Sequence, residues 1–345
     1  MNLELYFGII SIGLSFLSCF FLTRWLVTFL QGKKMTVLDY HKVDKPSIPR
    51  PGGPAIIVGI ILGESVLFVG SGSYAILALI LATLISGLVG IVDDLKTLGG
   101  IAKPALLLIA GIPILAIEYL VPNANVYSHH FYLPLFHVPA SLPLIYPALV
   151  LVAIPVVTNT INTIDVLNGV VSGFILIACI PVTFDIYLRV LAGKTDPIVL
   201  LAMFPILGAS LAFFIFHKYP SKIFPGDSGA IALGAAYGTM AIIGGAELVA
   251  VVAILPAILN SFFFLSSVKR LVEHRQLKIQ PTIAQEDAKL LANRDPKAPV
   301  TLVRMLVSKD PLSEDEIVKE IFKLELFCAL LAGITSILTW VIFVG

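Results

Sequence analysis

Long runs without a charged side chain recur along the whole of this sequence. One such run extends from Ser73 to Val92, and about 17 to 25 consecutive apolar residues are enough for a helix to cross a bilayer. Comparable windows begin near residues 5, 53, 73, 104, 143, 169, 198, 228, 247 and 323. Only 13% of all residues are charged, against about a quarter in a soluble domain. The sequence therefore predicts an all-α polytopic membrane protein with about ten transmembrane helices.

The lysines and arginines are distributed unequally between the connections of these helices. With ten helices, the odd-numbered connections lie on one side of the membrane. Of the 23 basic residues, only Arg189 and Lys194 fall on the other side. Because short cytoplasmic connections are enriched in lysine and arginine, we expect the odd-numbered connections in the cytoplasm and both termini outside. The chain is then a single integral membrane domain, residues 1–345, with cytoplasmic segments at 31–52 and 269–321.

The remaining composition narrows the function only a little. The net charge of +1 gives no reason to expect a nucleic-acid partner. The three cysteines, Cys19, Cys179 and Cys328, lie inside apolar runs, which favours a packing role over a disulfide framework or a zinc site. The first apolar window lacks a basic leading segment and a small-residue cleavage site, so we expect a retained helix and not a signal peptide.

Two adjacent carboxylates, Asp93 and Asp94, end the third apolar window. At the rim of a bilayer they repel each other and are costly to desolvate. A cationic group should therefore lie beside them, such as a metal ion, a lysine or a substrate. The plainer alternative is a pair of solvated rim residues that Lys96 neutralises.

Three further polar clusters fall on the same, cytoplasmic side. Each cluster, in the order in which they are named below, also has a plain structural explanation: a helix break capped by asparagines, a tight turn before a helix, and a basic membrane anchor. A shared face for all of them favours a chemical site instead. The clusters are the segment 158–169 with Asn159, Asn162, Asp165 and Asn168, the turn Phe224-Pro225-Gly226-Asp227-Ser228-Gly229, and Glu273-His274-Arg275.

Carboxylate and amide oxygens without a cluster of cysteine or histidine suit a hard cation, Mg²⁺ or Mn²⁺. Magnesium prefers few protein ligands together with water or phosphate oxygens. Asp227, an asparagine of segment 158–169 and a diphosphate would satisfy it. Lys103, Arg275 and Lys278 are available to neutralise phosphate. These residues predict a magnesium-dependent site for a phosphate-bearing substrate.

The order of these motifs resembles that in the polyprenyl-phosphate N-acetylhexosamine-1-phosphate transferases, of the glycosyltransferase family 4 type. The shared motifs are the Asp-Asp pair, the Asn-Thr-Ile-Asn…Asn-Gly segment, the Phe-Pro-Gly-Asp-Ser-Gly turn and the late His-Arg pair, within a stretch from about Asp44 to the last window. Members of that family transfer a sugar 1-phosphate from a uridine diphosphate sugar to a lipid phosphate. They release uridine monophosphate and require Mg²⁺. The resemblance thus implies ten helices and an active site on the cytoplasmic face.

The same resemblance assigns roles to individual residues. Asn162 and Asp227 match positions that hold magnesium against the diphosphate. Lys103 matches a phosphate-neutralising lysine, and Asp93 and Asp94 match an acidic pair proposed as base, nucleophile or metal-organising residues. The expected substrate-binding residues are Asn159, Phe224 near the uracil, Asn168 and Gly169 in the nucleoside pocket, and His274 and Arg275, which clasp the diphosphate and recognise the sugar.

The late cytoplasmic segment departs from one branch of the family. Members that use a muramoyl-pentapeptide substrate have a histidine-rich stretch there, whereas this chain has only His274. The chain is more similar to the UDP-N-acetylglucosamine–dolichyl-phosphate branch, which implies an archaeal or eukaryotic-type glycan lipid pathway. The expected partners are UDP-N-acetylglucosamine, a polyprenyl or dolichyl phosphate and the bilayer, with a homodimer left open. The membrane would be the cell membrane in a prokaryote and the endoplasmic reticulum membrane in a eukaryote.

The expected reaction is a direct in-line transfer. A phosphate monoester has a second pKa of about 6, so the lipid phosphate is mostly dianionic at neutral pH and needs no strong base. We therefore expect Asp93 and Asp94 to orient the metal and the nucleophile, with a modest base role for Asp94 left open. Residues 31 to 53, including Arg50, either anchor the chain or capture the lipid phosphate. Ser313 and Glu316 have the spacing of a capping box that opens the last helix.

Two other function classes remain as alternatives. A secondary transporter would have ionisable groups near the bilayer midplane, where Glu64 is the clearest example in this chain. A non-catalytic membrane scaffold would need no acidic cluster on one face. Within the family, a phospho-N-acetylmuramoyl-pentapeptide transferase is the second candidate.

Overall fold

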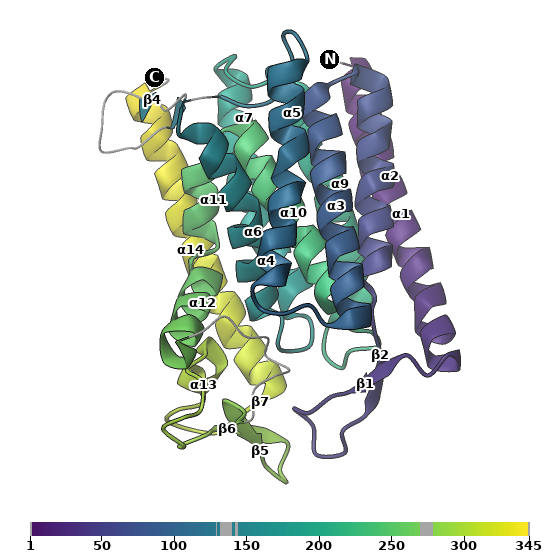
Figure 1. The fold of residues 1–345 in the computed structure, drawn as a ribbon, viewed down its shortest axis with the longest axis vertical. Coiled ribbons are helices and arrows are strands. Elements are labelled where there is room, and N and C mark those ends of the chain that lie inside the picture. Colours follow the sequence, from purple (N-terminus) through teal and green to yellow (C-terminus); the bar gives the residue numbers. More distant parts are fainter. Residues whose placement is uncertain (1, 129, 132–139, 142–143, 270–278, 344–345) are drawn as a thin grey trace.

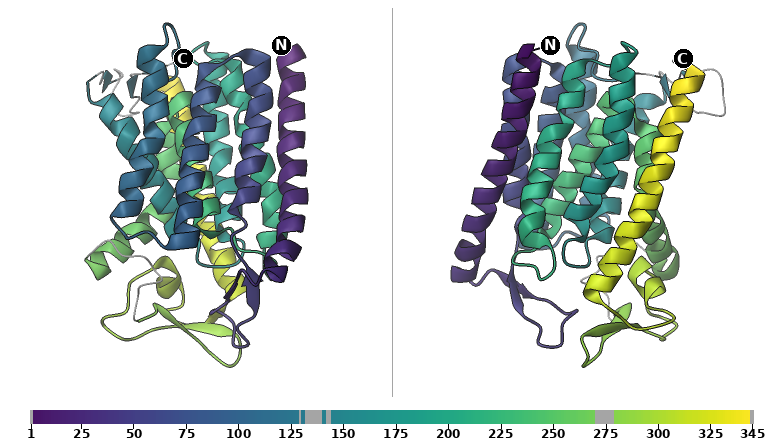
Figure 2. Two further views of the ribbon diagram at one scale, coloured as in Figure 1. Left: turned by 45° about the vertical axis from the view of Figure 1, so that its right-hand side comes forward. Right: turned by 180° about the vertical axis from the view of Figure 1, so that it is seen from behind.

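The computed structural model is a bundle of long helices with two small sheets at one end and a third at the other (Figure 1). It describes residues 2–128, 130–131, 140–141, 144–269 and 279–343. Both termini lie at the other end of the bundle (Figure 1). The first helix, α1 (Asn2–Gly32), and the last, α14 (Glu314–Phe343), lie at opposite edges (Figure 2). This mostly helical architecture confirms the predicted fold class in its coarse form.

Each of the predicted apolar windows coincides with helix. Three windows contain a short break, which divides the fourth into α4, the 3₁₀ helix η1 and α5, the seventh into α8 and α9, and the ninth into α11 and α12. The helices between α1 and α14 are α2 (Gly53–Ser71), α3 (Tyr74–Lys96), α4 (Ala102–Leu107), η1 (Leu108–Gly111), α5 (Ile112–Leu120), α6 (Tyr146–Ile164), α7 (Val170–Leu191), α8 (Pro197–Leu201), α9 (Met203–His217), α10 (Gly226–Gly244), α11 (Glu247–Ala253), α12 (Leu255–Val268) and α13 (Leu302–Leu306).

Fewer helices than predicted have the length and composition of a membrane span. Within the described residues, eight pass on these two properties. The pair α11 and α12 passes only together and is bent by 67°, so it adds a ninth if it is one span. α10 is not among them. All 19 of its residues, many of them glycine and alanine, are buried, so other helices and not lipid surround α10.

α10 contacts its neighbours so closely that glycine is required. A Cβ atom on Gly90 of α3 would lie 2.5 Å from the Cα of Ser228, and one on Gly53 of α2 would lie 2.2 Å from the amide nitrogen of Gly229. Only a residue without a side chain permits such an approach. The end of α3 is therefore held against the first turn of α10, which brings the acidic pair of α3 beside Asp227.

Short antiparallel strands, which the sequence did not predict, lie outside the helices. β1 (Thr36–Leu38) pairs with β2 (Ser47–Pro49) in the connection between α1 and α2, with Thr36 opposite Pro49. In the segment before α14, β5 (Thr282–Ala284), β6 (Lys289–Ala292) and β7 (Leu312–Ser313) form a sheet in that order. β3 (His130–Phe131) pairs with β4 (Ala140–Ser141). Parts of both predicted cytoplasmic segments thus have regular structure.

The start of α14 confirms the predicted capping box. The Ser313 hydroxyl and amide donate to the same carboxylate oxygen of Glu316, each at 2.8 Å, and the Glu316 amide approaches Ser313 Oγ at 3.4 Å. α14 therefore begins at Glu314, well before the apolar window near residue 323, because its first turns are polar. The three cysteines are free and buried, as expected for packing residues.

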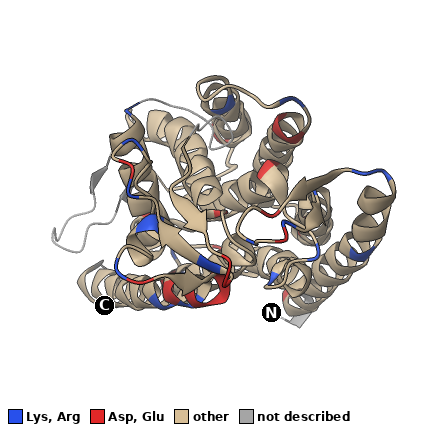
Figure 3. Ribbon diagram, turned by 90° about the horizontal axis from the view of Figure 1, so that it is seen from below, with Lys and Arg blue, Asp and Glu red and all other residues tan. Residues whose placement is uncertain are grey.

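Many of the charged residues gather at the end of the bundle that carries β1, β2 and the sheet β5–β7 (Figure 3). They lie on loops and helix ends, as a membrane protein requires. The acidic residues of the candidate site lie at this same end.

Candidate active site

Asp227 lies in the first turn of α10 and is the centre of a charged cluster. Its Oδ1 accepts hydrogen bonds from Lys103 Nζ of α4 at 2.8 Å and from Asn162 Nδ2 of α6 at 3.0 Å. Its Oδ2 lies 2.5 Å from a guanidinium nitrogen of Arg50, which follows β2. Residues far apart in the sequence therefore converge on one carboxylate.

Asp94 accepts hydrogen bonds from the N-terminal end of α10. Its Oδ1 accepts the backbone amide of Asp227 at 3.0 Å and the guanidinium of Arg50 at 2.9 Å. Its Oδ2 accepts the backbone amide of Ser228 at 2.9 Å and the Ser228 hydroxyl at 2.7 Å. The first amides of a helix have no partner within the helix, and a negative charge is favourable there. Asp94 thus caps α10 from a different helix and fixes the position of Asp227.

Asp93 points in a different direction and is fully buried. Its Oδ2 lies 2.7 Å from Lys103 Nζ, and its Oδ1 accepts the backbone amide of Leu98. Lys103, itself 1% exposed, therefore bridges Asp93 and Asp227. Burial excludes the alternative of a solvated rim pair. Lys103 and Arg50 are the cations that the paired carboxylates require.

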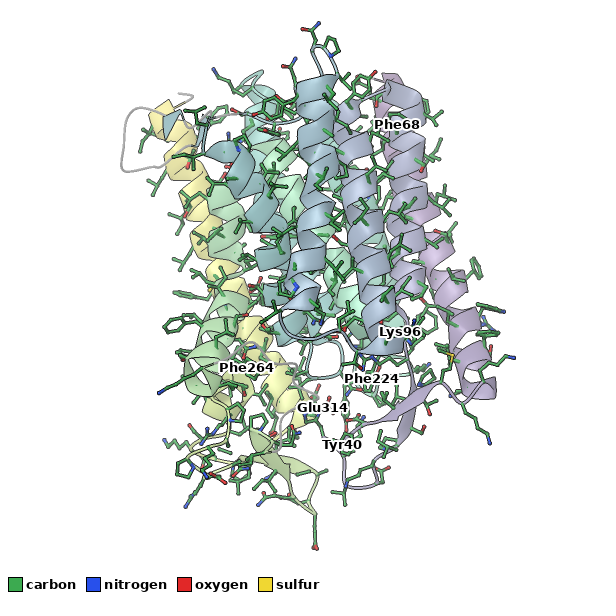
Figure 4. The ribbon with its side chains drawn as sticks, in the orientation of Figure 1. Tyr40, Phe68, Lys96, Phe224, Phe264 and Glu314 are labelled. Carbon is green, nitrogen blue, oxygen red and sulfur yellow. The ribbon has the colours of Figure 1, made fainter. Side chains whose placement is uncertain are left out.

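A cavity of about 370 Å³ opens beside Asp227. Its wall is formed by hairpin β1–β2, the segment between α6 and α7, the end of α9 and the turn before α10. Tyr40, Phe224 and Glu314 mark this end of the bundle, far from Phe68 (Figure 4). Neither carboxylate of the acidic pair lines the cavity. The lining residues are 37–41, Arg50, Asn162, residues 165–168, His217, Phe224, Gly226 and Asp227.

The resemblance assigns Asn168 and Gly169 to a nucleoside pocket, and of these two residues only Asn168 lines the cavity. Gly169 has a φ of +85° and precedes α7, a conformation that favours glycine. Asn168 lines the cavity but is almost completely buried. Its Oδ1 accepts the amide of Ser221 at 2.7 Å, and its Nδ2 donates to Glu314 and to Asp39. The side chain of Asn168 is therefore already engaged by protein groups.

Asp165 is a further carboxylate in the cavity wall. Burial raises the pKa of Asp165 to about 8, against the opposing effect of Arg50, while the carboxylates of Asp227 and Asp94 raise it further. The imidazole of His217 lies 3.9 Å from Asp165 Oδ1 and bonds to the hydroxyl of Ser172 at 2.9 Å. Asp165 can therefore act as a neutral hydrogen-bond donor near pH 7.

A second cavity, of about 520 Å³, is also lined by Asn162. Its lining is mostly apolar and comes from α4, α6 and α12, with Phe264 and Leu265 on α12. Lys103 and Asn162 stand at its polar side. Asn159 lines this second cavity and not the first, and its Nδ2 donates to the carbonyl of Pro155. Of the two asparagines one helical turn apart, only Asn162 reaches both cavities.

The structure therefore brings together most of the predicted site residues: Asp93, Asp94, Lys103, Asn162, Asn168, Phe224 and Asp227. Gly169 follows Asn168 directly but lines neither cavity. His274 and Arg275 lie outside the described residues. Sequence reasoning assigned no site role to Asp39, Asp165, His217 or Glu314. For Asp165 a signal existed, because it continues the three-residue spacing of Asn159 and Asn162. Asp39 and Glu314 have no local motif.

The oxygen donors suit magnesium better than zinc. No group of three or more His, Cys, Asp or Glu residues that could hold a metal occurs in the described part of the chain. Asp227 offers a carboxylate, and Asn162 would offer its amide oxygen if the amide turned over. A hard cation that also uses phosphate and water oxygens needs no more than this. Arg50 and Lys103 currently occupy the oxygens of Asp227.

Residues 76–245 match the family model of glycosyl transferase family 4. A protein of Saccharolobus solfataricus, named UDP-N-acetylglucosamine–dolichyl-phosphate N-acetylglucosaminephosphotransferase, is 30% identical over 68% of this chain and 71% of its own length. A glycosyltransferase of Methanocaldococcus jannaschii is 26% identical over 98% of both chains. The phospho-N-acetylmuramoyl-pentapeptide-transferase of Bacillus licheniformis is 29% identical over 60% of this chain and 64% of its own.

The chain belongs to glycosyl transferase family 4. It is a glycosyl-1-phosphate transferase, an integral membrane enzyme whose fold places a cluster of acidic and basic side chains at one end of the helix bundle.

Proposed function

We propose that this enzyme transfers N-acetylglucosamine 1-phosphate from UDP-N-acetylglucosamine to a polyprenyl phosphate of the dolichyl type. The reaction releases uridine monophosphate, depends on Mg²⁺ and begins the assembly of a lipid-linked glycan, for protein N-glycosylation or for the cell surface. One observation carries the proposal. Asp227 and Asn162 meet where a cavity with a polar side adjoins a mostly apolar one. The name of the Saccharolobus relative supports the choice of sugar and lipid.

The cavity beside hairpin β1–β2 is the proposed site of the nucleotide. Phe224 lines it and offers an aromatic face for the uracil. Arg50, with one nitrogen between two carboxylates, is close enough to contact a diphosphate that enters beside Asp227. The resemblance implies that His274 and Arg275 contact the diphosphate and the sugar.

The second cavity is the proposed site of the lipid. Its aliphatic and aromatic lining suits an isoprenoid chain, because the removal of both apolar surfaces from water is favourable. At its polar side, Lys103 would neutralise the phosphate of the lipid. In this arrangement the lipid phosphate reaches Asp227 from the side opposite the nucleotide, as an in-line displacement requires.

The proposed membrane arrangement retains ten spans, with α10 and the bent pair α11–α12 counted as spans. Both termini then face outward, and the candidate site faces the cytoplasm. The position of the lysines and arginines along the sequence supports this orientation. In a prokaryote the membrane is the cell membrane, and in a eukaryote it is that of the endoplasmic reticulum. A homodimer stays a prediction from the sequence.

Asp227 and Asn162 are the residues that would hold Mg²⁺, with Mn²⁺ as a substitute. A metal at this position would neutralise the charge that develops on the diphosphate. Lys103 neutralises the attacking phosphate, and Arg50 moves from the carboxylates to the diphosphate. The attacking phosphate needs little deprotonation because its second pKa is about 6.

The acidic pair positions the reacting groups and takes no proton in this mechanism. Both oxygens of Asp94 already accept two hydrogen bonds each. Asp93 is enclosed between Lys103 and the backbone of Leu98. A general base must reach the proton that it removes, and neither carboxylate lines the proposed lipid cavity or the nucleotide cavity.

The other function classes have less support. Glu64 and Glu325 are buried carboxylates without a hydrogen-bond partner among the described residues, as a transporter would use. Neither lines the two cavities described above. A scaffold would gain nothing from a buried lysine held between two carboxylates, since such pairs are costly to desolvate.

The decisive experiment uses the purified full chain in detergent with UDP-N-acetylglucosamine, a polyprenyl phosphate and Mg²⁺. We expect release of uridine monophosphate and formation of a glycolipid only when all three are present. Asp227→Ala should abolish both products, whereas Asp196→Ala, at the opposite end of the bundle, should retain them. A panel that includes UDP-N-acetylgalactosamine and UDP-N-acetylmuramoyl-pentapeptide identifies the sugar. Uptake of UDP-sugar into liposomes without product would support the transporter instead.

A further inference from the structure

Glu314, the first residue of α14, reaches into the wall of the nucleotide cavity. Its Oε1 accepts the backbone amide of Asn168 at 2.7 Å and also the side-chain amide of the same residue. Glu314 is 3% exposed. A carboxylate buried to this degree is costly unless hydrogen bonds or a cation compensate it. The two hydrogen bonds from Asn168 therefore help to compensate the burial of the Glu314 carboxylate.

Hairpin β1–β2 contributes the other half of the same network. Asp39 Oδ2 accepts from Asn168 Nδ2 at 3.3 Å and from Lys42 Nζ at 2.8 Å. Lys42 Nζ also lies 3.9 Å from Glu314 Oε2. Burial alone would raise the pKa of Asp39, but the hydrogen bond and charge of Lys42, together with Asn168 and His41, lower that pKa overall. One lysine therefore holds two carboxylates around Asn168.

Asn168 is fixed from several sides as a result. Besides Glu314 and Asp39, the amide of Ser221 donates to its Oδ1 at 2.7 Å. Asn168 and Asp39 line the nucleotide cavity, but Glu314 does not. Glu314 can therefore influence a bound nucleotide only through the residues that it holds.

The alternative is that Glu314 simply stabilises the first turn of its own helix. Acidic residues are favourable at that place, and α14 begins with Glu314, Asp315 and Glu316. Glu316 does have this role, because it forms the capping box with Ser313 at the surface. Glu314 instead bonds to Asn168, 146 residues away in the sequence. The two glutamates of one helical turn thus have different partners.

We propose that Glu314 is a positioning residue that sets the affinity for the donor nucleotide by holding Asn168 in the cavity wall. It thereby connects the segment before α14, with its sheet β5–β7, to the nucleotide site. This inference rests on the proposed function, because it assumes that the cavity beside Asp227 binds the nucleotide.

The test compares Glu314→Ala, Glu314→Gln and the control Glu316→Ala. The measurements are KM and kcat for UDP-N-acetylglucosamine, and the Kd of uridine diphosphate by calorimetry. A hydrogen bond to a buried charge is lost in Glu314→Ala, so we expect KM and Kd to rise about ten- to a hundred-fold. We expect kcat to change less than about threefold, because Glu314 does not contact the reacting groups. Glu314→Gln keeps one acceptor oxygen and should recover part of the affinity, and Glu316→Ala should match the wild type.

The outcomes separate this inference from the proposed function. If the wild-type chain binds no uridine nucleotide, the proposed function itself is wrong. If the wild type binds and folded Glu314→Ala binds equally well, Glu314 is not a positioning residue. The inference is also wrong if kcat falls as much as KM rises, or if Glu316→Ala weakens binding equally. Should Glu314→Ala fail to fold, the comparison of Glu314→Gln with Glu316→Ala decides: equal affinities overturn the inference.

Discussion

Replacement of Asp94 by asparagine tests whether this carboxylate positions α10 or removes a proton. The asparagine keeps one oxygen, which can still accept the amide of Asp227 and the guanidinium of Arg50. Its NH₂ group then faces the amide of Ser228, and two donors cannot bond. The Ser228 hydroxyl can reverse and accept, so one buried amide of the first turn loses its partner.

The expected cost follows from these contacts. A buried donor without a partner costs about 1–3 kcal/mol, and loss of a negative charge at a helix N-terminus costs about 0.3–2 kcal/mol. We therefore expect Asp94→Asn to lower the free energy of unfolding by roughly 2–4 kcal/mol. Ser228→Ala removes only the hydroxyl bond and should cost about 0.5–1.5 kcal/mol. Thermal unfolding in detergent, followed by tryptophan fluorescence, measures both.

The activity of Asp94→Asn distinguishes the two roles. If Asp94 positions Asp227, the variant should need more Mg²⁺ for half-maximal turnover, while its pH–rate profile keeps the wild-type shape. A general base contributes about 10²–10⁴-fold to the rate. The reasoning is refuted if the variant unfolds at the wild-type temperature and has an unchanged Mg²⁺ dependence, yet loses at least about a hundredfold in kcat together with the acidic limb of its profile.

Three further predictions concern separate parts of the site. Burial raises the pKa of Asp165 from 3.8 to about 8, so between these values the folded chain keeps a proton that the unfolded chain releases. Stability should therefore fall as pH rises from about 4 to about 8, and Asp165→Asn should flatten this dependence of the unfolding temperature in metal-free buffer. Gly90→Ala places a Cβ 2.5 Å from the Cα of Ser228 and should lower the free energy of unfolding by about 1–3 kcal/mol. Gly333→Ala is the matched control, because a Cβ there would have no atom within 4 Å. Equal unfolding temperatures of the two variants would contradict the close packing. Arg50→Ala leaves the carboxylates of Asp94 and Asp227 without their shared cation, so we expect at least about a tenfold loss in kcat/KM, partly restored in Arg50→Lys. An unchanged kcat/KM in Arg50→Ala would exclude this role.

The helices could be predicted from the sequence because a bilayer allows few alternatives to long apolar helices. α10 is the instructive case. Its apolar residues marked a helix, but its glycines reflect packing against other helices and not contact with lipid. The strands were missed because they are two to four residues long and lie in the connections between helices.

The site could be predicted as a set of motifs, but not as a set of contacts. Adjacent residues on a helix point about 100° apart, so Asp93 meets Lys103 while Asp94 meets α10. No pattern in the sequence indicates which residue faces which partner. The pairing of Asn168 with Glu314 is harder still, because the two residues come from distant segments with no shared spacing. For Arg50 the sequence left two roles open, and neither was contact with Asp94 and Asp227.

Asn162 lines both cavities and bonds to Asp227 between them. This shared wall has a consequence for inhibitor design. A single molecule with a uridine-like head and an alkyl tail, joined by a short linker past Asn162, would occupy both cavities at once. Its second contact would form at an effective concentration set by the linker, so its affinity should exceed that of either half by orders of magnitude. A molecule with a linker too short to pass Asn162 would not have this increase in affinity.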